Sequence, residues 1–190
     1  LLSRHKVAVG ALSFVLLMTC GFLTFHIERS EYGSKVFPAD SEVAMRESEI
    51  DTRLPGTEIT LLRLQTFEPD EFHRAENLRR VEKIQREIES YGTKAATLSV
   101  VDVISDIHNA FVGKEGDTIP ANDSLISQYL MLVDFDDLTK LVDEDYSEVL
   151  IWIFGKRKPE KRYMKDNEAI RAIAKQYSAT NWEITVSGKD

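Results

Sequence analysis

Residues 148–154 read EVLIWIF, a run of apolar and β-favouring side chains after one acidic residue. A run of this length and composition predicts a buried strand. Downstream, four apolar residues recur at the spacing of a helix: Ile170, Ile173, Ala174 and Tyr177. Residues 182–186 are again typical of a strand. The last part of the chain therefore predicts a strand, a helix and a strand.

The same order is predicted nearer the N-terminus. Residues 59–67 (ITLLRLQTF) predict an apolar strand, and residues 94–98 predict a short one. Between them, apolar residues recur every three or four positions: Phe72, Ala75, Leu78, Val81, Ile84, Ile88 and Tyr91. This spacing predicts a long amphipathic helix.

Two further helices are predicted between the second and third strands. Ser99 and Asp102 have the spacing of a capping box. Residues 122–124 offer N-caps for another helix, which we expect to bend or restart near residues 134–137. The complete order predicts an α+β domain, a ferredoxin-like split βαβ unit with a helical insertion. The two most apolar strands, 59–67 and 148–154, should be central and adjacent, with the other two at the edges.

An uncharged apolar segment, residues 7–25 (VAVGALSFVLLMTCGFLTF), precedes this domain. A helix of this length just crosses a bilayer core of about 30 Å. A cleaved signal peptide is the competing prediction, but its apolar core is usually shorter and ends in small residues. Arg4 and Lys6 before the segment predict a cytoplasmic N-terminus.

The predicted organisation therefore has three parts. Residues 1–27 hold a cytoplasmic flank and a transmembrane helix. Residues 28–56 are a linker with one helical turn near residues 43–50, because Gly and Pro interrupt any longer pattern. Residues 57–190 form an extracytoplasmic domain.

The charge of the chain excludes one class of partner. The formal net charge is -8, and the acidic excess lies beyond residue 30. Nucleic acid is therefore disfavoured, because its phosphates are bound by Lys and Arg. The single cysteine, Cys20, allows no intramolecular disulfide.

No group of residues has the spacing of an active site, so we expect neither an enzyme nor a metal or cofactor site. The four histidines are scattered, and G-x-S-x-G, P-loop and G-x-G-x-x-G motifs are absent. The acidic residues between 134 and 145 offer carboxylates for calcium, but Thr139 stands where an EF-hand loop needs glycine. A solvated helix face and turn is the favoured interpretation.

One basic run stands out in the acidic domain. It comprises Lys156, Arg157, Lys158, Lys161 and Arg162. An anionic lipid surface or an acidic neighbouring subdomain would attract these side chains. The alternative is a solvated loop between a strand and a helix. If the third strand returns toward the bilayer, the run lies at the membrane-facing end of the domain.

Several segments, in their order and spacing, resemble the porter domain of the resistance-nodulation-division (RND) superfamily. The resemblance is to the hydrophobe and lipid exporters grouped with the mycobacterial large membrane proteins (MMPL), and most to the second of their two repeated halves. The segments are residues 36–43 (VFPADSEV), 54–57 (LPGT), 99–102 (SVVD), 119–120 (IP), 126–130 (ISQYL), 135–137 (FDD) and 141–146 (LVDEDY).

The resemblance implies a proton-driven exporter in the inner membrane of a prokaryote. The periplasmic domain, with its counterpart from the other half, would form part of the path of a hydrophobic or lipid-like substrate. Its partners would be the remaining transmembrane helices and the other porter domain, and the proton-relay residues would lie in helices outside this chain. The alternative is a single-pass, membrane-anchored extracytoplasmic binding or assembly module.

Overall fold

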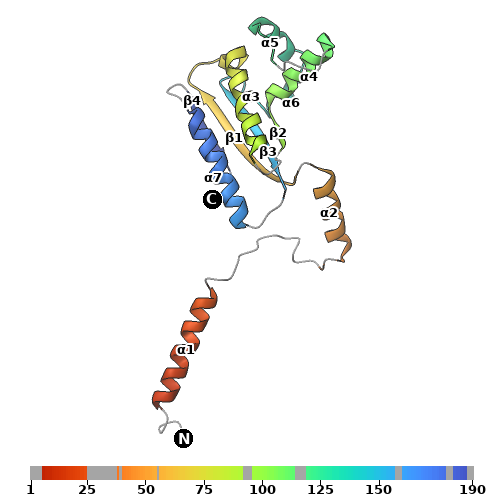
Figure 1. Ribbon diagram of the computed structural model, residues 1–190. Coiled ribbons are helices and arrows are strands. Elements are labelled where there is room, and N and C mark those ends of the chain that lie inside the picture. Colours follow the sequence, from red (N-terminus) through yellow and green to blue (C-terminus); the bar gives the residue numbers. More distant parts are fainter. Residues whose placement is uncertain are drawn as a thin grey trace. The chain divides into compact units, whose positions relative to one another are not determined.

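The computed structural model describes residues 6–24, 38, 40–54, 56–91, 96–113, 119–156, 160–178 and 182–187. The chain divides into two compact units, Leu1–Val36 and Phe37–Asp190. The first unit contains helix α1 (Lys6–Thr24), and the second contains the other described elements (Figure 1).

Helix α1 has 19 residues and carries exposed apolar side chains, among them Leu12, Phe14 and Leu17. No helix among the described residues has both the length and the apolar content that crossing a bilayer requires. The predicted span, residues 7–25, also includes Phe25, which lies outside the described residues.

A four-stranded antiparallel sheet forms the centre of the second unit. Its strands are β1 (Glu58–Thr66), β2 (Ala96–Leu98), β3 (Glu148–Gly155) and β4 (Trp182–Ser187), in the spatial order β2-β3-β1-β4. β1 pairs antiparallel with both β3 and β4, and β2 pairs only with β3. The predicted α+β class, the central pair of strands and the two edge strands are therefore confirmed.

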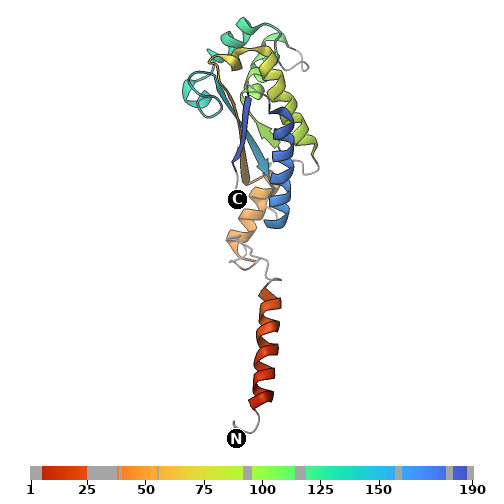
Figure 2. The same ribbon diagram turned by 90° about the vertical axis from the view of Figure 1, so that its left-hand side faces the viewer.

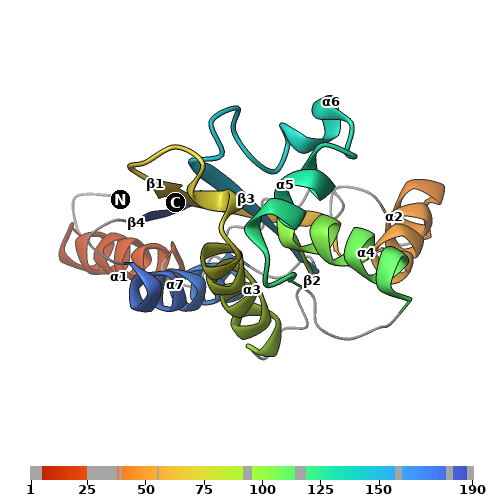
Figure 3. The same cartoon turned by 90° about the horizontal axis from the view of Figure 1, so that it is seen from above.

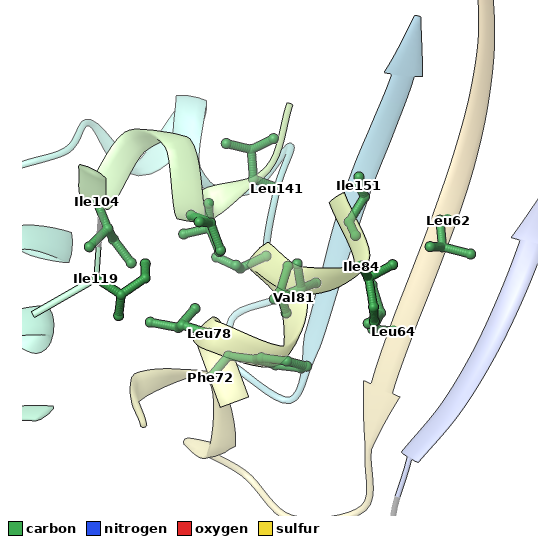
Figure 4. Close-up of a cluster of buried hydrophobic side chains, with 14 of the residues drawn as sticks. Leu62, Leu64, Phe72, Leu78, Val81, Ile84, Ile104, Ile119, Leu141 and Ile151 are labelled. Carbon is green, nitrogen blue, oxygen red and sulfur yellow. The ribbon is translucent and has the colours of Figure 1, made fainter. Parts of the chain in front are cut away.

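Helices α3 (Ala75–Ser90) and α7 (Glu160–Tyr177) cover one face of the sheet (Figure 3). Side chains alternate along a strand, so every second residue of β1 and β3 faces these helices. Leu62, Leu64 and Ile151 point from the strands into the core, where they are fully buried together with Val81 and Ile84 of α3 (Figure 4). Each such side chain stabilises the fold by about 1.5–3 kcal/mol.

The predicted helical insertion is present between β2 and β3. It contains α4 (Val100–Val112), α5 (Asp123–Leu130) and the short α6 (Phe135–Leu138). The helix after residue 122 does stop and restart, as its sequence predicts. The Asp123 carboxylate accepts a hydrogen bond of 2.8 Å from the Ala75 N–H, which ties the insertion to the first residue of α3.

The capping box at the start of α4 is also confirmed. The Ser99 hydroxyl accepts from the Val101 N–H at 3.1 Å, and the Asp102 carboxylate accepts from the Ser99 N–H at 2.7 Å. Gln85 of α3 donates to Asp102 at 2.9 Å and accepts from the Ser99 hydroxyl at 2.8 Å. Burial raises the pKa of Asp102 above its ordinary value. This network joins α3 to α4.

The segment expected to be a linker with one helical turn contains a longer helix, α2 (Glu42–Arg53), of 12 residues. The Ser41 hydroxyl caps it by accepting from the Ala44 N–H at 3.2 Å. Pairs of opposite charge four residues apart, Glu42 with Arg46 and Glu49 with Arg53, support the helix along one side. The Gly and Pro on which the shorter prediction rested lie before and after this helix, at positions 33, 38, 55 and 56, and so do not interrupt it.

Candidate binding surface on the open face of the sheet

The sheet face opposite α3 and α7 carries two rows of apolar side chains. One row is Ala96, Phe154 and Ile59, and the next is Leu98, Trp152 and Leu61. Residues directly opposite each other on paired strands share a face, and the residues between them, such as Thr60 and Ile153, are buried against the helices. We call these six residues the apolar rows.

The apolar rows are accessible to solvent. Ile59 is 47% exposed and Leu98 is 40% exposed, and both aromatic residues are half-buried. The rings of Trp152 and Phe154 lie near parallel, with centroids 6.5 Å apart and an interplanar angle of 20°. The Trp152 Nε1–H donates to the Lys140 carbonyl at 3.0 Å, which fixes the indole on the sheet. Because the indole is already held in place, the apolar rows can bind an apolar group with little loss of side-chain conformational entropy.

Beyond the apolar rows the same face becomes polar. Arg63 pairs with Glu148 at 2.5 Å, and Gln65 lies beside Glu148 and Glu183 in the register of the sheet. The hydrogen bond to the Glu148 carboxylate raises the pKa of Arg63 above its ordinary value. The face is therefore divided, with its apolar half at the end where β1 begins and β3 ends.

The predicted basic run begins at this same end. Lys156 follows the last residue of β3 and is exposed, whereas Arg157 and Lys158 lie outside the described residues. The expectation that residues 156–162 form one loop is wrong, because α7 begins at Glu160 and includes Lys161 and Arg162. Proline followed by an acidic residue, as at positions 159–160, favours the start of a helix.

Two of the four histidines that the sequence singles out have described contacts with neighbouring side chains. His73 contacts Asp70, with 3.2 Å between Nδ1 and Oδ1, and His108 Nδ1 lies 3.1 Å from the Tyr129 hydroxyl. His5 and His26 are outside the described residues. Among the described residues, no three His, Cys, Asp or Glu side chains gather as a metal site.

Within the acidic segment 134–145, one carboxylate organises a turn. Asp143 accepts hydrogen bonds from the Ser147 N–H at 2.8 Å, the Ser147 hydroxyl at 2.6 Å and the Glu148 N–H at 2.8 Å. It thereby positions the first residue of β3. Asp134, Asp136 and Asp137 are exposed.

Sequence reasoning identified both central strands but missed the apolar rows. The signal was available, because residues 59 and 61, like residues 152 and 154, are apolar on the alternation that faces away from the helices. The apolar content of these strands was used only to place them at the centre of the sheet, and no face was assigned to individual side chains. In the part of the domain that the structure describes, α3 and α7 cover only one face of the sheet.

Comparison with known proteins adds no family. No protein-family model matches the chain, and no curated protein matches it either.

Proposed function

We propose that this chain is part of a proton-driven RND-type exporter of the MMPL group, and that its domain lines the path of a hydrophobic or lipid-like substrate. The observation that carries the proposal is the pair of apolar rows on the open sheet face. Solvent-exposed apolar surface of this kind favours a binding role, because isolated monomers rarely expose contiguous apolar patches. The surface has no nucleophile beside a general base, which favours binding over catalysis.

The proposed fold within this assignment is the ferredoxin-like split βαβ sheet of a porter subdomain. Its support is the strand order β2-β3-β1-β4 with antiparallel neighbours, together with α3 between β1 and β2 and α7 between β3 and β4. The inserted helices α4, α5 and α6 then correspond to the segment that separates the two halves of the motif.

We further propose that residues 7–25 anchor the protein in the inner membrane, with the domain on the periplasmic side. The support is the uncharged sequence of this segment and the exposed apolar side chains of α1. Two side-chain hydroxyls of α1 are compatible with lipid, because Thr19 and Thr24 donate to carbonyls one turn earlier, both at 2.8 Å. Arg4 and Lys6 support the orientation.

Photolabelling with a lipid probe tests the binding role. The full chain is reconstituted in vesicles with a fatty acid that carries a diazirine group, irradiated, digested and mapped by mass spectrometry. Labels are expected on β1 and β3, at the outward-facing Ile59, Leu61, Trp152 and Phe154. Replacing Ile59 and Leu98 together by Asn should lower this labelling several-fold. Leu132→Asn is a matched control, because Leu132 is also exposed but belongs to the insertion.

Labels confined to α1, with no change in the variant, would contradict the binding role. The exporter assignment has a separate test in the coding sequence that follows Asp190. Further apolar spans there would support an exporter, whereas a nearby stop codon would favour the single-pass binding or assembly module.

A further inference from the structure

Helix α2 carries a second exposed apolar surface. Val43 and Ile50 of the helix are 52% and 47% exposed, and Leu54, the C-cap residue that follows Arg53, is 53% exposed. They are seven and four residues apart, so at 100° per residue they lie within about 20–40° of one another around the helix axis. We call these three residues the α2 stripe. Met45 lies on the opposite side of the helix.

The α2 stripe is tied to the end of the sheet that carries the apolar rows. α2 ends at Arg53 and β1 begins at Glu58, so only a short connection separates them. Within that connection Gly56 is buried against Gly155, so the connection is held to the end of β3. Figures 1 and 2 both show α2 beside this end of the sheet.

The two surfaces match in dimensions. Ile50 and Leu54 are one helical turn apart, about 6 Å along the axis. Ile59 and Leu61, which belong to successive apolar rows, are two residues apart on β1, about 7 Å. A helix lying across the rows can therefore place one stripe residue against each row.

Their charges are also complementary. The sequence of α2 contains four acidic residues and two arginines, so the helix is acidic. The end of the sheet that it would approach carries the exposed Lys156, followed in the sequence by Arg157 and Lys158. Opposite charges on the rims of two apolar surfaces favour one docking orientation over others.

We infer that α2 docks onto the open sheet face of its own domain, with the α2 stripe against the apolar rows, and so covers the binding surface in a closed conformation. The consequence of this docking, regulated access of an apolar ligand to the sheet, rests on the proposed function. The contact itself is a property of the chain and can be measured without a ligand.

Disulfide trapping in the full chain tests the contact. Cys20 is replaced by Ser, which removes the single native thiol. Cysteines are then introduced by Ile50→Cys and Leu98→Cys, and the membrane-reconstituted protein is oxidised mildly. Because a disulfide requires Cα atoms within about 7 Å, a rapid cross-link within one chain is expected. The matched control pairs Met45→Cys with Leu98→Cys and should react roughly tenfold more slowly, since its effective concentration is lower.

Three outcomes overturn the inference. The first is that the Ile50–Leu98 pair cross-links no faster than the Met45–Leu98 control. The second is that Ile50→Cys cross-links equally fast to the remote Met131→Cys. The third is that cross-links form only between chains. The last outcome would mean that α2 of a second copy covers the surface. Lys156→Glu should slow the Ile50–Leu98 cross-link at low salt and have little effect at high salt.

Lipid labelling separates this inference from the proposed function. If α2 covers a lipid-binding surface, replacing Val43 and Ile50 by Ser should increase labelling of β1 and β3 several-fold. A cross-link without any labelling would leave the contact intact and contradict the lipid-binding role. Labelling without a cross-link would support the lipid-binding role and contradict the docking of α2.

Discussion

The backbone of Gly155 lies directly against Gly56. A Cβ atom at position 56 would be 2.0 Å from the Gly155 carbonyl oxygen, and Gly56 has a φ of +159°. This contact joins a residue two positions before β1 to the last residue of β3, so it sets where the central pair of strands begins.

Gly56→Ala should therefore destabilise the domain strongly. The obstructing atoms belong to the backbone and cannot rotate away, so we expect a loss of about 3 kcal/mol or more in the free energy of unfolding. Gly113→Ala is the control, because φ is +68° there but a Cβ would meet open space. It should cost only about 1–2 kcal/mol. Chemical denaturation measures both, and equal losses would contradict the steric explanation.

Ser99→Ala should weaken the junction between α3 and α4. The substitution removes the N-cap of α4 and leaves the buried carbonyl oxygen of the Gln85 side chain without its hydroxyl donor. We expect a loss of about 2 kcal/mol in the free energy of unfolding. Ser90→Ala, at an exposed hydroxyl near the end of α3, should change stability by less than about 0.5 kcal/mol. A similar loss in both variants would mean that the Ser99 network is unimportant.

The phenol of Tyr177 should ionise at an unusually high pH. Its hydroxyl donates to the Glu87 carboxylate, and this hydrogen bond, aided by burial, raises the pKa of Tyr177 from 10.0 to about 12. The raised pKa means that the folded state holds this proton more tightly than the unfolded chain. The contribution of this hydrogen bond to the stability of the fold is therefore complete below pH 10 and is lost as the pH rises toward 12.

Ultraviolet absorbance of the ionised phenol measures this titration, with Tyr177→Phe identifying the signal. Glu87→Gln should return the pKa of Tyr177 toward its ordinary value. An unchanged titration in Glu87→Gln would show that the carboxylate is not the cause.

The basic run should bind anionic membranes. The second unit, residues 37–190, has its own core and can be tested without α1. Each Lys or Arg near an anionic surface gains about 1 kcal/mol, less at physiological salt. Replacing Lys156, Arg157 and Lys158 by Glu should therefore weaken binding to anionic vesicles, most at low salt. Reversing Lys83, Arg79 and Arg86 on α3 by the same substitution is the charge-matched control, and an equal effect would remove any special role of the basic run.

The elements that were predicted correctly have signals within a few residues of one another. The capping box at Ser99, the apolar and β-favouring composition of β1 and the helical spacing of α3 are such signals, and the tertiary structure agrees with them. The length of α2 was underestimated, because its apolar residues are few and its support comes from ion pairs along the helix. The basic loop was predicted to be longer than it is, because a run of Lys and Arg residues does not show where a helix begins.

The apolar rows illustrate what local signals leave out. They arise only when β2, β3 and β1 lie side by side, and this order joins residues from three separate parts of the sequence. The strands were recognisable one at a time, but the uncovered face depends on both α3 and α7 packing on the same side. The side of the sheet on which each helix packs is set by the handedness of the β1–α3–β2 and β3–α7–β4 connections, and no single strand determines it.

The pairing of β1 also has a consequence for synthesis. Both neighbours of β1 come from the second half of the chain, because β3 and β4 flank it and β2 does not touch it. A ribosome that has released only β1, α3 and β2 has therefore made an apolar strand with no partner to close its edges. Such a nascent chain is exposed to aggregation until β3 is translated. The domain is thus expected to need a chaperone before its central strand is enclosed.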